Sequence, residues 1–283
     1  MNLAHTRLVD PREPRLPRSL ADEWVYRYTD REGLLKWFAA SGELRMNAWS
    51  AMNDPRETKA WTVTGPWSAT GALTRHDVER RVDEIARRSA RLLSTTRERE
   101  PESEDRRALL MHRGWANAPM WQHYAKGYAG ACIVFDMAEL HANLGTIVGA
   151  SGQRRGMGWI DYHDRPAEIA LEGEFASETD VDLAVETYLD SHGNHLPLHF
   201  QKSVNWAYEN EARLFSIVLE ASPADFDQPL DKLPARSALQ AVILGDAHDD
   251  PRASAAQLRA GLGDDLEVLQ CRWPGGHPIL EAL

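Results

Sequence analysis

The chain of 283 residues has few cysteines, no long apolar run and no excess of basic residues. Its two cysteines, Cys132 and Cys271, are too few for a disulfide framework or a four-thiolate zinc site. No segment approaches the ~20 apolar residues of a membrane span. The first residues carry prolines and arginines instead of the apolar stretch of a secretory signal. These absences predict a cytoplasmic protein without a membrane segment.

The charge balance is acidic. The formal net charge is -11, from 32 lysines and arginines against 43 aspartates and glutamates. Phosphate backbones attract lysine and arginine in excess, so this balance argues against a standing nucleic-acid-binding surface. It leaves open a nucleic-acid substrate held in a local basic groove. The arginines of the segment 76–93 are expected on a solvated helix face.

Common motifs of nucleotide and hydrolase chemistry are also missing. The chain has no G-x-x-x-x-G-K-[ST] phosphate loop, no dinucleotide-binding glycine fingerprint and no G-x-S-x-G nucleophile elbow. The one histidine group is His192, His195 and His199, and Pro197 breaks the helical spacing of its last pair. We therefore expect no metal site.

Strand-like and helix-like segments alternate without a regular βαβ rhythm, which predicts an α+β fold. We expect residues 1–22 to form a mobile arm and residues 23–283 a single domain. A loop is expected over 95–107, and the segment 178–203 is expected to be mostly helical. The expected strands are 25–29, 43–47, 130–135, 159–162, 209–219 and 239–245, and the expected helices include 30–40 and 76–93. Four local features are also expected: a left-handed helix end at Gly42, a turn at Asn53-Asp54-Pro55, a capping box of Thr74 and Asp77, and a helix cap at Asp136.

The segment Trp206–Phe215 carries the densest chemistry. If it is a strand, Glu209, Glu211 and Arg213 point to one face because strand side chains alternate. Two anions and a cation beside aromatic rings suit a polar cleft. Two structural alternatives stay open: a helix start or solvated strand edge, and a partly buried ion-pair network that includes Arg27. Trp206 and Phe200 are expected in the core.

Three motifs together resemble the bacterial domain-of-unknown-function family 2971 over roughly residues 24–246. One departure concerns residues 110–115, where members often carry a Cys-Phe-Ser-like segment. The motifs are Tyr26-Arg27-Tyr28-Thr29 with Met52-Asn53-Asp54-Pro55-Arg56-Glu57, then Pro119-Met120-Trp121-Gln122-His123-Tyr124-Ala125, then Lys202-Ser203-Val204-Asn205-Trp206-Ala207-Tyr208-Glu209-Asn210-Glu211-Ala212-Arg213.

A weaker resemblance is to enzymes of the ADP-ribosyltransferase fold. Arg27 and Thr29 are similar to their opening strand motif, and Glu209-Asn210-Glu211 to their closing Glu-x-Glu motif. This resemblance implies a split mixed β-sheet flanked by helices, with NAD as the substrate. It implies that Glu211 stabilises the developing positive charge and that Glu209 orients or deprotonates the acceptor.

The same resemblance implies a set of NAD-binding residues. Arg27 would clamp the diphosphate, for which a guanidinium is well shaped. The full expected set is Arg27, Tyr28, Thr29, Trp121, His123, Tyr124 and Arg213, with Tyr28, Trp121 or Tyr124 stacking on the nicotinamide and His123 helping to hold the substrate.

The expected function is cleavage of the nicotinamide–ribose bond of NAD, with transfer of ADP-ribose to water or to an unknown acceptor. That acceptor is a protein, a nucleic acid or a small molecule. A toxin or phage-defence setting, with an inhibitor protein as partner, fits such an activity. Two alternatives stay open: a non-catalytic module that binds a nucleotide or a protein, and a metal-dependent nuclease or hydrolase that uses Glu209 and Glu211.

Overall fold

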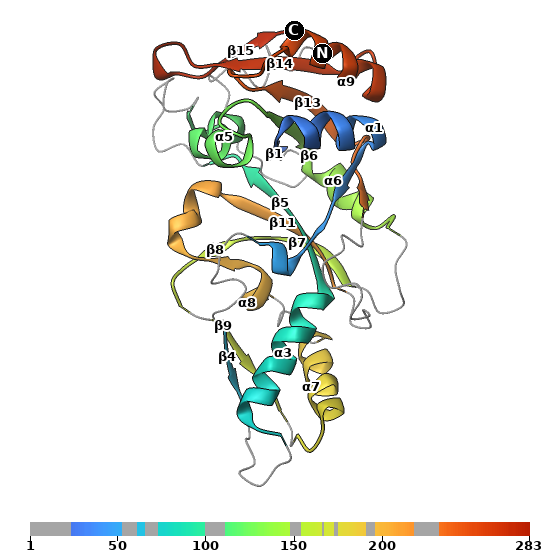
Figure 1. Ribbon diagram of the computed structural model, residues 1–283, viewed down its shortest axis with the longest axis vertical. Coiled ribbons are helices and arrows are strands. Elements are labelled where there is room, and N and C mark those ends of the chain that lie inside the picture. Colours follow the sequence, from blue (N-terminus) through green and yellow to red (C-terminus); the bar gives the residue numbers. More distant parts are fainter. Residues whose placement is uncertain are drawn as a thin grey trace.

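The computed structural model describes residues 24–52, 61–65, 73–99, 111–147, 154–165, 167–172, 175–190, 196–217 and 232–283. Two predictions, the arm 1–22 and the Asn53-Asp54-Pro55 turn, lie outside these residues. The molecule is elongated, with α9 and β13 to β15 at one end and α3 and α7 at the other (Figure 1). None of the described helices has the length and apolar character needed to cross a membrane.

A large mixed sheet forms the centre of the fold, in the order β15-β14-β13-β6-β1-β5-β11-β7, and β3 also pairs with β5. Only β13 and β14 run parallel, and the other pairs of this sheet are antiparallel. Its strands are β1 (Trp24–Thr29), β3 (Asn47–Ala48), β5 (Ala90–Arg97), β6 (Ala131–Asp136), β7 (Arg154–Trp159), β11 (Glu211–Ile217), β13 (Leu239–Leu244), β14 (Glu267–Arg272) and β15 (Ile279–Ala282).

Within the described ranges, three two-stranded pairs lie outside this sheet. They are β2 (Glu43–Arg45) with β12 (Lys232–Pro234), β4 (Trp61–Thr64) with β9 (Ala167–Ala170), and β8 (Asp161–Tyr162) with β10 (Gln201–Lys202).

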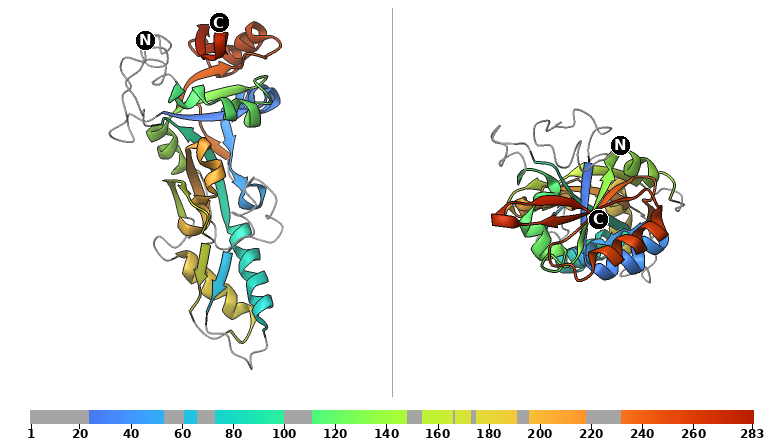
Figure 2. Two further views of the ribbon diagram at one scale, coloured as in Figure 1. Left: turned by 90° about the vertical axis from the view of Figure 1, so that its left-hand side faces the viewer. Right: turned by 90° about the horizontal axis from the view of Figure 1, so that it is seen from above.

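Helices surround the sheet, and Figure 2 shows the same arrangement from two other sides. The α-helices are α1 (Ala39–Ser41), α3 (Arg75–Ser89), α5 (Ala118–Tyr124), α6 (Met137–Leu144), α7 (Glu178–Asp190), α8 (Leu196–His199) and α9 (Pro251–Leu262). A π-helix, η3 (Gly33–Phe38), precedes α1, and the 3-10 helices are η4 (Trp49–Ala51), η5 (Gly114–Ala116), η6 (Val204–Glu209) and η8 (Pro274–Gly276).

The described residues form three hydrophobic clusters, and two of them lie on opposite faces of the sheet. On one face, Val25 and its neighbours pack against η3, α6 and α9. On the other face, Tyr26 and Tyr28 pack beneath η5 and α5. A third cluster joins α3, α7, β4 and β9 at the far end. Alternation along β1 explains the first two clusters, since neighbouring strand residues point to opposite faces.

The sheet is split between β1 and β5. β1 pairs with β6 at six positions but with β5 only at Val25↔Arg97 and Tyr26↔Thr96. Further along the same edge, β5 pairs instead with β3, through Leu92 and Arg91. Residues 93–95 of β5 therefore have no ladder partner on this edge among the described residues.

Several local predictions are confirmed. β1 and β13 form where expected, and Gly42 ends the first helix in the left-handed region, with φ of 68°. Thr74 and Asp77 form the expected capping box at the start of α3. Asp136 caps α6 by accepting a hydrogen bond of 2.9 Å from the Glu139 amide. Phe200 is buried, as predicted.

The helix 76–93 and the loop 95–107 were predicted wrongly where they meet. The helix ends at Ser89, and Ala90–Arg97 is strand β5, while residues 100–107 lie outside the described part of the chain. β5 pairs with β11 over seven positions, from Thr96 to Ala90. This long ladder overrides the helical spacing of Ala90 and Leu93, because tertiary pairing outweighs local propensity.

One arginine of α3, Arg81, is less exposed than a solvated face implies, whereas Arg75 and Arg80 are more than half exposed. Arg81 is 18% exposed and donates to Asp182 of α7 at 2.6 Å and to Glu84 at 3.0 Å. Arg80 pairs with Glu178, also on α7, at 3.2 Å. Arg80 and Arg81 hold α7 against α3, because each is paired with a carboxylate.

Candidate functional site

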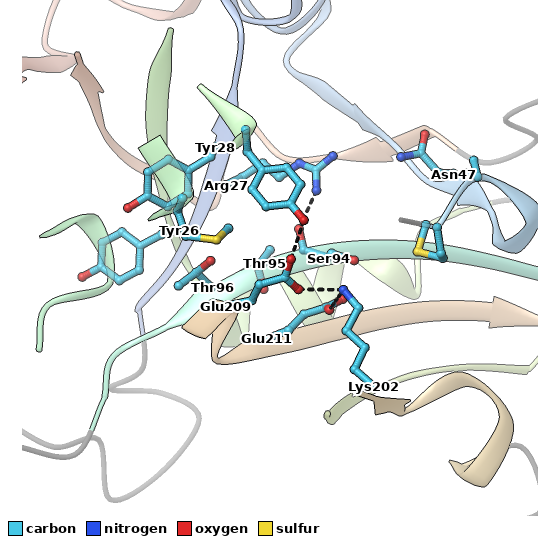
Figure 3. Close-up of a pocket in the computed structure, with 14 residues that line it drawn as sticks. Tyr26, Arg27, Tyr28, Asn47, Ser94, Thr95, Thr96, Lys202, Glu209 and Glu211 are labelled. Carbon is cyan, nitrogen blue, oxygen red and sulfur yellow. Dashed lines mark hydrogen bonds and ion pairs between the residues drawn. The ribbon is translucent and has the colours of Figure 1, made fainter. Parts of the chain in front are cut away.

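A cavity of about 250 Å³ lies at the split between β1 and β5 (Figure 3). Its wall comes from segments far apart in the sequence, since β1, β3, β5, α5, β10 and η6 all contribute. The lining residues are Tyr26, Arg27, Tyr28, Asn47, Ala51, Met52, Ser94, Thr95, Thr96, Met120, Tyr124, Lys202, Glu209 and Glu211.

Glu211 is held as a buried anion. Arg213 lies on the same strand face and donates to both carboxylate oxygens, from Nε at 2.8 Å and from Nη2 at 3.1 Å. Lys202 Nζ lies 2.8 Å from Oε2 of Glu211. The main-chain amide of Glu211 donates to the Tyr162 hydroxyl at 2.8 Å, which fixes the start of β11. Glu211 is 2% exposed, so these contacts replace its solvation by water.

Glu209 lies on a different element from Glu211, which corrects the prediction of one continuous strand. It is the last residue of η6, and Asn210 then turns the chain in the left-handed region, with φ of 43°. Asparagine tolerates this region better than most residues, because its short side chain bonds the local backbone. The side-chain amide of Asn210 donates to the main-chain carbonyl of Glu98 at 2.7 Å. The turn brings both glutamates to Lys202.

Lys202 bridges the two carboxylates. Its ammonium lies 2.6 Å from Oε2 of Glu209, in addition to its contact with Glu211. The Tyr124 hydroxyl donates to the other oxygen of Glu209. Lys202 is itself 5% exposed, so the bridge lies in the protein interior (Figure 3). Two carboxylates that contact the same ammonium repel each other, and the shared cation offsets this repulsion.

The environments move the pKa values of the two glutamates apart. Burial raises the pKa of Glu209, Lys202 opposes this effect and the charge of Glu211 adds to it. Burial also acts to raise the pKa of Glu211, but Arg213 and Lys202 outweigh it and lower that pKa to about 2. Glu211 is therefore the permanent anion of the pair, and Glu209 is the carboxylate that takes a proton more readily.

Arg27 adds a further cation to the same pocket. Its Nη1 donates to the main-chain carbonyl of Ser94 at 2.7 Å. Among the described residues, no carboxylate lies within ion-pair distance of its guanidinium, although Glu211 and Glu209 contribute to its electrostatic field. Burial lowers the pKa of Arg27, and this side chain remains charged at any physiological pH. Three cations, Arg27, Lys202 and Arg213, thus accompany two carboxylates, which suits an anionic ligand.

Polar side chains line the wall of the cavity beside Arg27. Asn47 comes from β3, and Ser94, Thr95 and Thr96 are consecutive residues of β5. The Thr95 hydroxyl donates to the Ala212 carbonyl at 3.0 Å, which ties β5 to β11. Hydroxyl and amide groups at this wall suit a ligand that carries hydroxyls of its own, such as a sugar.

The structure brings together five of the nine residues that the sequence assigned to the site: Arg27, Tyr28, Tyr124, Glu209 and Glu211 line the cavity. Arg213 lies behind Glu211 and positions it. Trp121 is fully buried, contacts Tyr28 edge-on at 5.2 Å and donates to the Trp115 carbonyl, so it is a core residue. Thr29 and His123 do not belong to the lining.

Several lining residues were missed by the sequence reading. Lys202 opens the Lys202–Arg213 motif, but nothing in the sequence indicates that it reaches both glutamates. Asn47 and Ser94 reach the pocket only because β3 and β5 pair there. Trp206 was expected in the core, yet it is only half-buried, because it lies on the surface helix η6. The sequence does hold one signal for the polar wall: the polar run Ser94-Thr95-Thr96 directly follows two leucines.

Within the part of the chain that the structure describes, no group of three or more His, Cys, Asp and Glu side chains is arranged to hold a metal ion. His199 is fully buried, with its ring 4.3 Å from that of Trp49, whereas His192 and His195 lie outside the described residues.

Comparison with known families gives one match. Residues 120–214 match the model of the family described as "Protein of unknown function (DUF2971)". The matched region runs from α5 to β11 and includes Tyr124, Lys202, Glu209, Glu211 and Arg213, while Arg27 precedes it. The match supports the resemblance seen in the motifs. Neither the curated proteins nor the solved structures gave a match to this chain.

Proposed function

We propose that the protein cleaves the nicotinamide–ribose bond of NAD and transfers ADP-ribose to an acceptor, in an ADP-ribosyltransferase-like split sheet. The observation that carries the proposal is the cavity at the split, where Arg27 lies in one pocket with a carboxylate pair of unequal pKa. A guanidinium suits a diphosphate, and a fixed carboxylate suits a developing oxocarbenium charge. The hydroxyl and amide wall adds hydrogen-bonding groups for a ribose.

The size of the cavity limits which part of NAD it holds. At about 250 Å³ the cavity falls just below the range of ~300–1,000 Å³ that is usual for drug-sized ligands. It suits one nucleoside-sized unit and is too small for a whole dinucleotide. We assign it to the nicotinamide–ribose half, because that half carries the bond to be broken.

In the proposed step, the bond between ribose C1′ and the nicotinamide nitrogen breaks. Its electron pair goes to that nitrogen, so neutral nicotinamide leaves and positive charge develops on the ribose. An acceptor oxygen or nitrogen then supplies the electron pair of the new bond to C1′. The acceptor's proton passes to Glu209. With water as the acceptor, the product is free ADP-ribose.

The two glutamates have different roles in this reaction. Glu211 stays ionised and stabilises the positive charge at the ribose, and Arg213 positions it. Burial raises the pKa of Glu209, and a raised pKa makes this carboxylate a stronger general base. Losing one such transition-state contact typically lowers the rate roughly 100- to 1,000-fold.

The alternative of a metal-dependent nuclease has less support from the site. A metal ion would need the space between Glu209 and Glu211, and Lys202 Nζ already lies there, 2.6 Å and 2.8 Å from their oxygens. A non-catalytic nucleotide-binding module would use the same pocket, and it differs from an enzyme only in releasing no product.

Calorimetric titration with NAD tests the binding half of this proposal. Arg27→Met should weaken NAD binding at least tenfold, because it removes the cation assigned to the diphosphate and leaves the carboxylate pair in place. Arg31→Met is the matched control, since Arg31 is half-exposed and its carboxylate partner, Asp249, lies 3.9 Å away. Equal affinities of wild type and Arg27→Met for NAD, from folded protein, would contradict the proposal.

A further inference from the structure

Three aromatic rings form a cluster beside the pocket. Trp206 and Tyr208 lie on η6, and His123 lies on α5. The Trp206 and Tyr208 rings are 6.1 Å apart and tilted by 36°, and the Tyr208 and His123 rings are 6.0 Å apart and tilted by 39°. His123 is exposed, while Trp206 and Tyr208 are half-buried. Tilted rings at these distances do not cover one another's faces, so this ring cluster offers a surface for stacking.

The main chain beneath the ring cluster is held in place by side chains. The Tyr208 carbonyl accepts hydrogen bonds from Asn117 Nδ2, at 2.6 Å, and from Arg99. Asn210 bonds the carbonyls of Arg97 and Glu98. These bonds fix the surface helix η6, whose residue Val204 is 47% exposed. A fixed surface loses less entropy when it binds a ligand.

The ring cluster adjoins the carboxylate side of the pocket. The Lys202 ammonium lies 5.5 Å from the centre of the Trp206 ring and 2.6 Å from Glu209. Tyr124, next to His123 in the chain, bonds the same carboxylate. In the proposed reaction the acceptor gives its proton to Glu209. The acceptor therefore arrives where the ring cluster lies.

We propose that the ring cluster binds the acceptor through a nucleobase, and that the acceptor is a single nucleoside or nucleotide. This inference rests on the proposed function. A nucleobase has a flat π face that stacks on aromatic side chains such as Trp206 and Tyr208. The net charge of -11 repels a polyanionic strand much more than it repels a single phosphate.

Transfer to a base uses a nitrogen that carries a hydrogen. An exocyclic amine or an N–H ring nitrogen of the base supplies the electron pair of the new bond to ribose C1′. The proton of that nitrogen passes to Glu209, and the pair of the broken bond leaves with nicotinamide. The reaction needs no oxidant and no further co-reactant.

Titrations with AMP, GMP, CMP and UMP, followed by saturation-transfer NMR in the absence of NAD, test this site. We expect saturable binding with signals from base protons. Trp206→Leu and Tyr208→Leu should each weaken it roughly five- to one-hundredfold, the effect of losing one base stack. Leucine keeps apolar bulk, and thermal melting checks the fold. Trp37→Leu is the matched control, because Trp37 is 44% exposed and stacks under Arg45 elsewhere.

The inference would be overturned by no saturable nucleotide binding to folded wild type, by unchanged binding in both ring-cluster variants, or by competition in which NAD displaces the nucleotide. The last result would assign the cluster to the adenine of NAD itself. Tighter binding of a single-stranded oligonucleotide would also overturn the choice of a small acceptor. Nucleotide binding by a protein that never releases nicotinamide would contradict the proposed function alone.

Discussion

The guanidinium of Arg27 donates a hydrogen bond of 2.7 Å to the main-chain carbonyl of Ser94, just beyond the point where strands β1 and β5 stop pairing. The side chain thus spans the split in the sheet from one strand to the other. The same split opens the cavity that contains the carboxylate pair. The gap in the ladder and the pocket are therefore one feature of the fold.

Lys202→Met tests the cation that both glutamates share. Lys202 is buried, and its removal leaves two carboxylates close together with one charge unpaired. We expect a loss of about 3–5 kcal/mol in the free energy of unfolding, measured by urea denaturation. Lys232→Met is the control. Lys232 is 63% exposed and pairs with Glu43 at 3.6 Å, so its loss should cost less than about 1 kcal/mol. Similar losses in both variants would contradict a structural bridge.

The loss of folding stability at acid pH should depend on Glu211. Its pKa falls from about 4.5 in the unfolded chain to about 2 in the folded protein. A lowered pKa contributes stability that is present above pH 4.5 and is lost as the pH falls towards 2. The contribution is on the order of 3 kcal/mol. Urea titrations across this pH range should show the loss in wild type. In Glu211→Gln the loss should be missing, and the same pH slope in both proteins would refute the assignment.

Asn210 should be replaceable by glycine but not by valine. Both variants lose the amide bond to Glu98, but glycine adopts the left-handed conformation readily. A β-branched residue is strained at positive φ. We expect Asn210→Val to be less stable than Asn210→Gly by roughly 1–2 kcal/mol, measured by thermal or urea unfolding. Equal stabilities would mean that the turn does not need the left-handed conformation.

The role of Glu209 as general base predicts that the rate of nicotinamide release falls at low pH, which is the low-pH limb of the rate profile. Because burial raises the pKa of Glu209, the base is protonated at a higher pH than an ordinary glutamate. The rate of nicotinamide release should therefore fall as the pH drops through a value above 4.5. In Glu209→Gln the residual rate should be lower and should not show this limb. A limb that persists unchanged in the variant would assign the titration to another group.

The sequence predicted local structure well where a residue has one strong conformational role. Gly42 at a helix end, Asp136 at a helix start and the apolar run of β6 all behave as expected. Prediction from the sequence failed where pairing between distant strands decides the secondary structure. Ala90 and Leu93 keep helical spacing, yet they lie in β5 because β11 and β3 pair with that strand.

The site was predictable only where its residues lie close together on one strand. Glu211 and Arg213 are two residues apart on one strand, so their shared face follows from sequence alone. Glu209 escapes that rule, because the left-handed turn at Asn210 ends the pattern. Lys202 and Asn47 belong to the pocket through tertiary contacts that no sequence spacing records.

Nicotinamide release from NAD by the purified protein tests the central claim most directly. The account predicts release by wild type and by the distant control Glu186→Gln, with a fall of roughly 100- to 1,000-fold in Glu209→Gln and in Glu211→Gln, each assayed where melting shows it folded. No release by folded wild type, with or without added nucleotides, would contradict an NAD-cleaving enzyme. Release at the wild-type rate in both glutamate variants would remove the carboxylate pair from the mechanism.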